Sequence, residues 1–335
     1  MKHVIFGGDG FVGRVLADRL AREGERVLVA DIARGDCPHY RHCEWLHVDV
    51  TRPDDLRKLE LRPGDAVYNL SAKMLSPIQV RAKRHDFFWP VNTHGTRHIL
   101  EAMKDGGATQ LVHFTTDMVY GHTKTVPMSE DHPVAPLGEY GASKLATEEM
   151  AAQWRANEGF DISLFRPRLI IGPGRLGILE KLFKLVDANL PVPMIGSGRN
   201  PYQFVSVYDC ADAAYLAWKA GFPNAAYNLG STNPPPVRRL LRTLIAEAGS
   251  RSILVPTPGW AVKRTLDALD AMNMPIMDPE QYLIADEECI LDCSAAERDL
   301  GWRAKHSDED MLVAAYREYR GARMGAPSPH ATEAA

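Results

Sequence analysis

The segment YGASK pairs a phenol with an amine, Tyr140 and Lys144, at the start of a predicted helix. A spacing of four residues places both side chains on one face of that helix. A tyrosine with an ordinary pKa of about 10 is a poor base at neutral pH, but a lysine cation one turn away and a positive nicotinamide nearby lower that pKa by stabilising the phenolate. With a nicotinamide beside it, Tyr140 could take a proton from a substrate hydroxyl as hydride leaves the adjacent carbon. The same spacing also occurs by chance as a pair on a helix surface, so it needs support from other residues.

A second candidate group lies in TTDMVYG, residues 115–121, which follows the apolar run QLVHF. Ligand sites in open α/β sheets gather at the carboxyl ends of the strands, and this segment begins where such a strand is predicted to end. Thr116 is therefore placed to hydrogen-bond the same substrate oxygen as Tyr140. Asp117 offers a carboxylate for proton transfer or for holding a substrate hydroxyl, although capping of the following turn is an equally good interpretation.

The motif GGDGFVG lies directly between a predicted strand and a predicted helix, with glycines at Gly7, Gly10 and Gly13. These glycines permit a tight turn, close approach of a pyrophosphate and close helix packing, and the helix N-terminus offers N–H groups to the phosphates. Asp31 ends the second strand, roughly the ~20 residues downstream at which the motif needs an acid for the ribose diol. Its carboxylate repels a 2′-phosphate, so the sequence predicts NAD, while the neighbouring Arg34 leaves tolerance of NADP open.

Asp49 follows the third predicted strand, in HVDV, and has two interpretations. Its carboxylate could accept a hydrogen bond from the adenine amino group of the cofactor. It could equally cap the helix that TRPDDL is predicted to begin. The residues alone do not separate these two roles.

Short apolar runs alternate with helical patterns over the first half of the chain. Near-continuous apolar strands that alternate with helices indicate a parallel sheet covered on both faces, so we expect a Rossmann-type, doubly wound α/β fold. The predicted strands are HVIFGG, RVLVAD, EWLHVDV, DAVYNLSA, QLVHFTT and DISLFRP, and the predicted helices are FVGRVLADRLAREG, TRPDDLRKLEL, NTHGTRHILEAMKDGG and YGASKLATEEMAAQWRANEG.

The pattern changes after Pro167, where glycine and proline become frequent. VYDCADAAYLAWKAG predicts a helix, AAYNLG a strand that rejoins the sheet, and VRRLLRTLIAEAG another helix, whereas residues 253–286 show no clear period. We expect an NAD-binding domain of residues 1–170 and 203–230 and a smaller, mostly C-terminal substrate-binding domain of residues 171–202 and 231–320. Residues 321–335 hold few large apolar side chains and predict a disordered tail.

The composition argues against several classes of protein. A chain of 335 residues can form one large or two moderate domains, and its net charge of −4 argues against nucleic-acid binding. The five cysteines, Cys37 among them, form no CxxC pair or Cys/His zinc pattern, so we expect reduced thiols and no metal. No apolar run approaches the ~20 residues of a membrane span, and the apolar N-terminus is too short for a signal peptide, so we expect a cytoplasmic protein.

Taken in order, the motifs of this chain resemble those of the extended short-chain dehydrogenases/reductases, in the NAD-dependent epimerase/dehydratase family. The resemblance covers residues 1 to about 319 and includes GGDGFVG, FTTDMVYG, YGASK, RPRLIIGPG, QFVSVYDCADA and LDCSAAERDLGW. It implies that Thr116, Tyr140 and Lys144 are the catalytic set, with Asp117 beside them. A tyrosine–lysine pair alone is weak evidence, but its combination with the glycine motif, Asp31 and Thr116 in this order is far more specific.

The resemblance also implies a cofactor site and an assembly. Asn92 stands where the family uses an Asn amide beneath the active site, with helix capping as the weaker interpretation. Family members often dimerise through two helices per subunit, so we expect a homodimer formed by the helices that contain Asn92 and Tyr140. The implied cofactor positions are Gly7, Gly10, Phe11, Val12, Gly13, Asp31, Ile32, Asp49, Val50, Leu70, Ser71, Ala72, Asn92, Thr115, Tyr140, Lys144 and Pro167.

Three positions depart from the family's pattern. In its sugar-nucleotide 4,6-dehydratases the stretch resembles STDEVYG, and the acid pair carries out the elimination of water. Met118 replaces the glutamate here, and a thioether cannot abstract a proton, so 4,6-dehydration is not expected. Leu169 and Tyr202 stand where an Asn and an Arg often grip a nucleotide diphosphate. Either other arginines replace them or the substrate is not a nucleotide sugar; the expected substrate contacts are Lys73, Thr116, Arg168, Arg175, Arg199 and Tyr202.

The leading interpretation is an NAD-dependent, epimerase-type enzyme that oxidises a secondary alcohol of a nucleotide sugar and returns the hydride to the ketone. The alternative is a dehydrogenase of an apolar alcohol that releases NADH, because FRPRLIIGPG is more like the 3β-hydroxysteroid and 4-carboxysterol dehydrogenase branch. A third possibility is a cofactor-sensing or scaffolding protein, which the intact catalytic set disfavours. Six apolar residues could line a pocket for the alternative, although core packing of the small domain is the better explanation for most of them: Trp260, Leu266, Leu269, Met272, Met274 and Met277.

Overall fold

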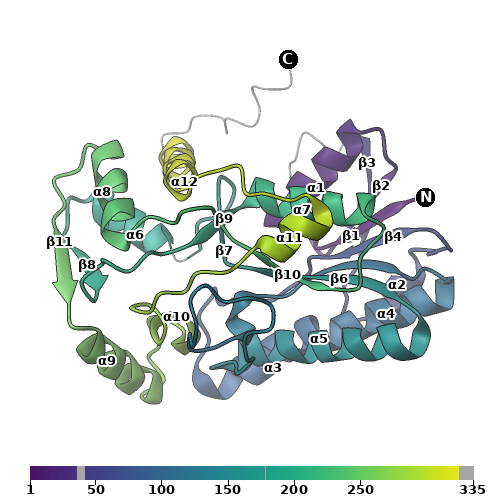
Figure 1. The fold of residues 1–335 in the computed structure, drawn as a ribbon, viewed down its shortest axis with the longest axis horizontal. Coiled ribbons are helices and arrows are strands. Elements are labelled where there is room, and N and C mark those ends of the chain that lie inside the picture. The colour runs from purple at the N-terminus through teal and green to yellow at the C-terminus, as the bar shows by residue number, and fades with distance from the viewer. Residues whose placement is uncertain (36–41, 178, 324–335) are drawn as a thin grey trace.

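A seven-stranded parallel sheet forms the centre of the larger domain (Figure 1). The computed structural model describes residues 1–35, 42–177 and 179–323. The strand order is β10-β6-β5-β4-β1-β2-β3, so the chain order reverses between β1 and β4. This reversal is the point at which doubly wound sheets open a ligand crevice at their carboxyl ends. The strands are β1 (His3–Phe6), β2 (Val27–Asp31), β3 (Cys43–His47), β4 (Ala66–Asn69), β5 (Gln110–Phe114), β6 (Asp161–Pro167) and β10 (Ala226–Leu229).

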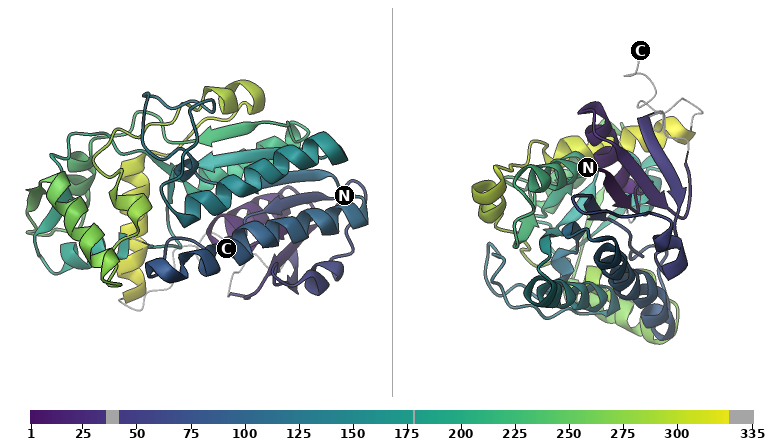
Figure 2. Two further views of the ribbon diagram at one scale, coloured as in Figure 1. Left: turned by 90° about the horizontal axis from the view of Figure 1, so that it is seen from below. Right: turned by 90° about the vertical axis from the view of Figure 1, so that its right-hand side faces the viewer.

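Helices cover both faces of this sheet (Figures 1 and 2). Successive strand residues alternate between two cores: Ile5 and Val29 pack on one side, and Val4 and Leu28 pack on the other. The predicted fold class and all seven predicted strands, including the one that rejoins the sheet, are confirmed. One face carries α1 (Phe11–Arg22), α7 (Val207–Lys219) and α11 (Ser294–Leu300), and the other carries α2 (Pro53–Arg57), η2 (Arg81–Lys83), α3 (Arg84–Trp89), η3 (Pro90–His94), α4 (Gly95–Gly106) and α5 (Glu139–Glu158).

A smaller unit extends from the carboxyl end of the sheet (Figure 1). It has its own core, which includes Phe183, Leu244 and Tyr316. The division into two domains remains a prediction; α11, which falls in the predicted substrate domain, packs Ala296 and Leu300 into the core of the large sheet instead. The remaining elements are β7 (Leu169–Ile171), α6 (Leu179–Asp187), β8 (Val192–Ile195), β9 (Phe204–Ser206), α8 (Val237–Glu247), β11 (Leu254–Thr257), α9 (Gly259–Ala271), α10 (Pro279–Tyr282) and α12 (Asp308–Arg323).

The segment without a clear period, residues 253–286, is more regular than its sequence indicates. It forms β11, α9 and α10. Trp260, Met272 and Met274 are 69%, 65% and 58% exposed, so neither core packing nor a pocket explains them. Apolar side chains on the solvent side of α9 and just after it hide the amphipathic period that would have predicted the helix.

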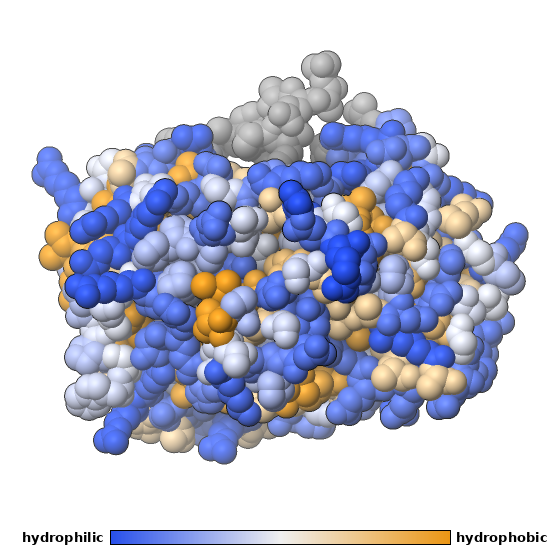
Figure 3. Space-filling model, viewed as in Figure 1, coloured by the Kyte–Doolittle hydropathy of each residue, from blue (hydrophilic) through white to orange (hydrophobic). Residues whose placement is uncertain are grey.

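Hydrophilic residues dominate the face in Figure 3, and the apolar residues on it form small, separate patches. No described helix combines the length and the apolar content that crossing a membrane requires. Helix α12 continues to Arg323, so the start of the predicted tail is helical. Residues 324–335 and Cys37 lie outside the described residues.

Candidate active site

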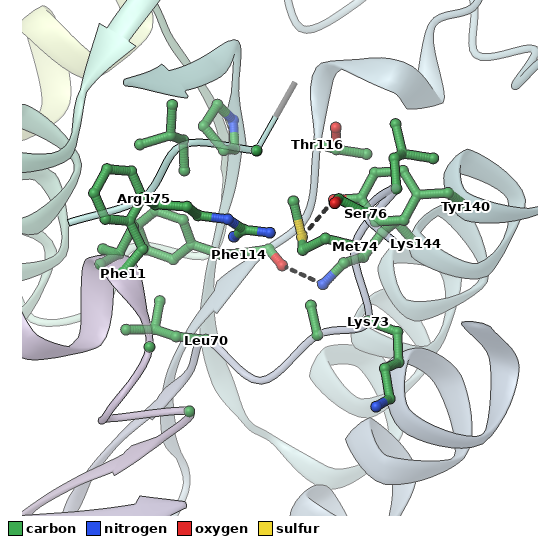
Figure 4. A pocket seen from close by; sticks show the side chains of 18 of the residues that line it. Phe11, Leu70, Lys73, Met74, Ser76, Phe114, Thr116, Tyr140, Lys144 and Arg175 are labelled. Carbon is green, nitrogen blue, oxygen red and sulfur yellow. Dashed lines mark hydrogen bonds between the residues drawn. The ribbon is translucent and has the colours of Figure 1, made fainter. Parts of the chain in front are cut away.

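One cavity of about 710 Å³ runs along the carboxyl ends of the central strands. The glycine loop after β1 lines one end, and Met277, Gln281 and Ile284 of the smaller unit line the other. Figure 4 shows Phe11 and Leu70 on one side, Thr116 and Tyr140 on the other, and the Arg175 side chain extending between them. The cavity is therefore long enough to join a cofactor region to a substrate region.

The glycine loop leaves both space and hydrogen-bond donors for a phosphate group. Gly7 has a positive φ of +69°, and a Cβ there would lie 2.7 Å from the backbone nitrogen of Ser71. A Cβ on Gly13 would lie 2.3 Å from the Gly7 carbonyl oxygen, so α1 packs against the loop only because that position is glycine. Helix α1 begins at Phe11 without a side-chain cap, which leaves its first N–H groups available at the cavity. Glycines and open helix donors together fit the pyrophosphate of a dinucleotide.

Asp31 lies at the end of β2, on the cavity wall. One carboxylate oxygen accepts the Asp9 N–H at 2.9 Å and the other accepts the Ala33 N–H at 3.3 Å. Both oxygens keep lone pairs for the hydroxyls of a ribose. The guanidinium of Arg34 lies 5.7 Å from the centre of the Trp45 ring, beside that ring, and forms no ion pair with Asp31 among the described contacts. This arrangement fits an unphosphorylated ribose and therefore NAD.

Asp49 lines the cavity and closes the turn that follows β3. Its Oδ1 accepts the Thr51 backbone N–H at 2.9 Å and the Thr51 hydroxyl at 2.7 Å. The N-cap residue of α2 is Arg52, without a side-chain cap, so the expectation that Asp49 caps this helix is wrong. Recognition of adenine by Asp49 stays a prediction.

Tyr140 and Lys144 lie one turn apart in α5, and each is 3% exposed. The Tyr140 hydroxyl donates to Sδ of Met74 at 3.4 Å, and the Lys144 amine donates to the carbonyl of Phe114 at 2.9 Å (Figure 4). Thr116 also lines the cavity, and its hydroxyl accepts the Met118 N–H at 3.2 Å. The three predicted catalytic side chains thus lie where β5 ends and α5 begins, and Met74 accepts the hydrogen bond of the Tyr140 hydroxyl there.

The electrostatic environment of Tyr140 differs from the one expected. Burial raises the pKa of Tyr140 above its ordinary value, and the Glu280 carboxylate raises it further, while a hydrogen bond with Thr116 and the Arg175 cation oppose the rise. Burial lowers the pKa of Lys144 to about 8. Without the cofactor, the pKa of Tyr140 thus lies above its ordinary value because the site is desolvated. The expected lowering includes the positive charge of the nicotinamide and stays a prediction.

Asp117 is held in a buried ion pair with Arg168. Burial alone lowers the pKa of Arg168, but the Asp117 carboxylate outweighs it and raises that pKa above its ordinary value. The capping interpretation of Asp117 is wrong, because the side chain that caps η4 (Asp117–Val119) is that of Thr116. Asp117 Oδ1 instead lies 3.3 Å from the Thr116 hydroxyl, which donates to it. A carboxylate fixed in this way orients its neighbour and is poorly suited to exchanging protons.

The two adjacent threonines have separate tasks. The Thr115 hydroxyl donates to Glu148 at 2.6 Å and also lies 3.0 Å from the Phe165 carbonyl. Arg166 holds Glu148 through three N–O distances of 2.6 to 3.2 Å and donates to the Tyr120 hydroxyl at 2.9 Å. Thr115 lines the cavity as predicted, but its hydroxyl belongs to this buried network behind β5 and β6. Thr116 is the threonine whose hydroxyl remains at the active site.

Asn92 supports the cavity wall from behind and does not line it. Its side chain is fully buried in the π-helical turn η3; the amide oxygen accepts the Lys73 N–H at 2.8 Å, and the amide nitrogen donates to the Lys73 carbonyl at 3.2 Å and to Ser143 at 3.0 Å. Direct cofactor contact by Asn92 is therefore corrected to an indirect role. The helix-capping interpretation is also wrong, since the amide ties the loop after β4, at Lys73, to Ser143 of α5.

The predicted substrate contacts have different outcomes. Arg168 and Tyr202 both line the cavity. The guanidinium of Arg168 is already paired with Asp117 and lies 5.1 Å from the centre of the Tyr202 ring. Arg175 lines the cavity and has no ion pair among the described contacts. Arg199 is exposed and lies outside the cavity lining, so its substrate contact stays a prediction without support from the cavity. Lys73 lines the wall, with its amine 5.5 Å from the centre of the Phe87 ring.

Several lining residues carry no signal in the sequence. Met74 and Gln281 reach the cavity from a loop and from a short helix, and neither belongs to a recognisable motif. Of the six apolar residues considered for a pocket, Met277 is the one that lines this cavity. A positional pattern could have indicated only Met74, which lies two residues after Ala72, the last of the predicted cofactor residues that follow β4.

The family model for the NAD dependent epimerase/dehydratase family matches residues 3–230. An uncharacterised protein of Sinorhizobium fredii is 31% identical over 325 residues, which are 96% of this chain and 79% of that protein. A UDP-glucose 4-epimerase of Mycolicibacterium smegmatis is 28% identical, covering 74% of this chain and 82% of its own length. A 2-alkyl-3-oxoalkanoate reductase of Stenotrophomonas maltophilia is also 28% identical, covering 75% and 76%.

Solved structures agree on the fold. The UDP-glucuronic acid 4-epimerase from Bacillus cereus, in complex with UDP-glucuronic acid and NAD, superposes with a TM-score of 0.76 at 22% identity, over 96% of this chain and 100% of that one. The family is NAD-dependent, and the cradle described above fits NAD. This chain is an enzyme of the extended short-chain dehydrogenase/reductase class and belongs to the NAD-dependent epimerase/dehydratase family.

Proposed function

We propose that this enzyme oxidises a secondary alcohol of a nucleotide sugar to a transient ketone and then returns the hydride, as an epimerase does. The observation that carries the proposal is the single cavity that joins the glycine loop to Thr116, Tyr140 and Lys144. Because the cofactor region and the substrate region share one cavity, one bound cofactor can both accept and return a hydride. Sequence similarity to a UDP-glucose 4-epimerase supports the substrate class.

Each catalytic residue has a distinct role in this proposal. Bound NAD supplies the hydride acceptor and a positive charge beside the phenol. Tyr140 takes the hydroxyl proton of the substrate and returns it in the reverse step. Thr116 hydrogen-bonds the same oxygen, and Asp117, fixed by Arg168, orients the Thr116 hydroxyl. Lys144 adds a charge one helical turn below the phenol when it is protonated.

Elimination of water is disfavoured by two side chains next to Thr116. Met118 lines the cavity where the dehydratases have an acid, and a thioether cannot take a proton. Asp117 is paired with Arg168 within the protein, so its carboxylate is not free to shuttle protons. The proposed reaction therefore ends with the hydride returned to a ketone that keeps its neighbouring substituents.

A second function is favoured by the apolar character of the substrate end. Met74, Leu75, Met118, Ile195 and Ile284 line this region. Arg168 is occupied by Asp117, so it is withheld from a diphosphate. These features, together with the similarity to a 2-alkyl-3-oxoalkanoate reductase, support a dehydrogenase of an apolar alcohol that releases its reduced cofactor.

The deciding experiment is to denature freshly purified protein and quantify the released NAD(H) by chromatography. Near-stoichiometric NAD supports a cofactor retained through turnover, and panels of UDP- and dTDP-sugars then identify the substrate. Protein that is purified without cofactor and binds NAD weakly contradicts the internal redox cycle. It directs the search to apolar secondary alcohols, with NADH appearance at 340 nm as the readout.

The predicted homodimer and cytoplasmic location stay proposals. The large apolar side chains that are exposed among the described residues, such as Trp260 and Met272, lie outside α4 and α5. A dimer through α4 and α5 would therefore bury mainly polar and small residues. Multi-angle light scattering at micromolar concentration tests it: a dimer mass supports the proposal, and the mass of one chain contradicts it.

A further inference from the structure

The catalytic helix α5 receives its N-terminal cap from a distant part of the chain. Its N-cap residue is Gly138, which has no side chain to satisfy the first N–H groups. The Glu280 carboxylate, from α10 of the smaller unit, accepts the Tyr140 N–H at 2.9 Å and the Gly141 N–H at 2.9 and 3.2 Å. Glu280 is 2% exposed, so these contacts are shielded from water.

Two glycines create the space that this carboxylate fills. A Cβ on Gly138 would lie 2.6 Å from Oε1 of Glu280, and its three nearest atoms all belong to Glu280. A Cβ on Gly141 would lie 2.8 Å from Oε2 of Glu280 and equally close to the Met118 carbonyl. A larger residue at either position would collide with the Glu280 carboxylate. We call this contact of Glu280 with the first turn of α5 the Glu280 joint.

Glu280 is itself held in place by charged groups. The Asp278 carboxylate caps α10 and accepts the Glu280 N–H at 3.1 Å. Arg84, at the start of α3, lies 3.4 Å from Asp278 and forms a buried ion pair with Asp270 of α9. The next residue after Glu280, Gln281, lines the substrate end of the cavity. One short helix thus contacts both the substrate region and the start of the catalytic helix.

We propose that Glu280 is a positioning residue for Tyr140: the smaller unit uses its carboxylate to fix the first turn of the catalytic helix and to influence the charge of the phenol. The proposal rests on the proposed function of Tyr140 as the proton-transfer group. It assigns a task to a residue outside the motifs of the family. It also gives the substrate end of the cavity a direct connection to the catalytic tyrosine.

The electrostatics around Glu280 agree with this role. Burial and, to a lesser extent, the nearby acids Asp278 and Asp117 raise the pKa of Glu280 to about 8, although the N–H groups of Gly141 and Tyr140 oppose the rise. Once ionised, Glu280 raises the pKa of Tyr140. Two nearby cations affect the neighbours of Glu280: Arg84 lowers the pKa of Asp278, and Arg175 lowers the pKa of Tyr140.

The first test follows the backbone amide of Tyr140 by NMR in protein labelled with ¹⁵N-tyrosine and loaded with NAD. The resonance is assigned by its loss in Tyr140→Phe. In the wild type we expect it to titrate with a midpoint near pH 8, as Glu280 ionises. In Glu280→Gln this titration should vanish. Lys144 also has a pKa of about 8 and is still present in Glu280→Gln. A titration that persists unchanged in this variant would therefore belong to Lys144 and would overturn the proposal.

The second test is a double-mutant cycle that measures, through the melting temperature, whether Gly138 and Glu280 are in contact. Gly138 has an extended backbone with φ −161°, which alanine also adopts, so Gly138→Ala is costly only through its clash with Glu280. We expect Gly138→Ala to lower the melting temperature by about 2 °C or more in the wild type. The loss should be clearly smaller in a Glu280→Ala background. Equal losses in both backgrounds contradict the joint.

Matched controls separate this contact from general effects. Gly321→Ala, in α12 where an added Cβ meets nothing within 4 Å, should leave the melting temperature unchanged or raise it slightly. Glu149→Gln, at an exposed position of α5, should leave the Tyr140 amide titration in place. The assignment to Glu280 fails if Gly321→Ala destabilises the protein as Gly138→Ala does. It also fails if Glu149→Gln abolishes the amide titration as Glu280→Gln does.

A third readout connects the joint to catalysis. With any substrate that the enzyme turns over, Glu280→Gln should move the acidic limb of the kcat/KM profile to lower pH over the range above about pH 8, where Glu280 is ionised and its negative charge acts on the phenol. An unchanged limb contradicts the electrostatic part of the proposal. If no nucleotide sugar is turned over, the proposed function fails, but the amide titration and the mutant cycle still decide the role of Glu280.

Discussion

The two ends of the cavity are built in different ways. The cofactor end comes from short loops at consecutive strand ends: the glycine loop after β1, Asp31 at the end of β2, and Leu70 to Ala72 after β4. The substrate end gathers single residues from distant segments, such as Met74, Arg175 and Gln281. The cofactor end thus carries chemistry that local motifs define, and the substrate end carries specificity that only the folded chain defines.

The variant Tyr140→Phe should have the largest effect and tests whether the two ends of the cavity act separately. It should lower turnover of the true substrate by about 10²–10⁴-fold, because proton transfer at the reacting oxygen is lost. The NAD content of the purified protein should change little, since the glycine loop and Asp31 lie at the other end of the cavity. Chromatography of released cofactor and steady-state kinetics measure the two effects separately.

Tyr215→Phe is the matched control for this variant. Tyr215 is a buried tyrosine of α7, outside the cavity lining, and loses the same hydroxyl. Its activity should remain close to that of the wild type. Retained biological function in Tyr140→Phe would instead revive a cofactor-sensing or scaffolding role.

The buried Arg168–Asp117 pair tests how the substrate end is held together. Removal of one partner, as in Arg168→Met or Asp117→Asn, should lower the free energy of unfolding by about 3–5 kcal/mol, because the other charge stays buried alone. Arg168→Met combined with Asp117→Leu should cost clearly less than the sum. Chemical denaturation measures all three; additive losses would show that the pair is not coupled.

The sequence predicts the cofactor end well because its residues are neighbours along the chain. The strands, the glycine loop, Asp31 and the catalytic set each follow from spacing within one strand–helix unit. Arg168 was expected to bind substrate, but no local pattern shows that Asp117 pairs with it. Glu280 and Tyr140 meet only after α10 packs against α5, and α9 was missed because its apolar side chains face solvent. Such contacts depend on tertiary packing, which periodicity and spacing do not encode.

Lys144 allows a test of the conflict between stability and chemistry. Its pKa is lowered from 10.5 to about 8 in the folded protein, so the unfolded chain binds more protons between these two values. The stability of the wild type should therefore rise with pH over this window, and burial of the charged lysine destabilises the fold below it. Lys144→Met should raise the free energy of unfolding at pH 7 by about 2 kcal/mol while turnover falls.

The gain from Lys144→Met should shrink as the pH approaches 10.5 and disappear above it, where the lysine is neutral in both states. Denaturation curves at several pH values measure this dependence. Lys184→Met, at an exposed lysine of α6, is the control and should show no such dependence. If the free energy of unfolding differed between Lys144→Met and the wild type by the same amount at every pH, the charge of Lys144 would not be the cause of the destabilisation.

Substitution of Arg175 should have the smallest effect, but it distinguishes a nucleotide-sugar substrate from an apolar alcohol. Arg175 is the arginine of the cavity lining that has no ion pair among the described contacts, and its side chain extends between the two ends (Figure 4). For a nucleotide sugar, Arg175→Met should raise KM by about 10-fold with a smaller change in kcat, and Arg175→Lys should recover part of the loss, because a diphosphate interacts with either cation. Arg199→Met, outside the cavity, should have no effect. For an apolar alcohol, Arg175→Met should leave KM unchanged, and that result would assign the substrate end to apolar contacts alone.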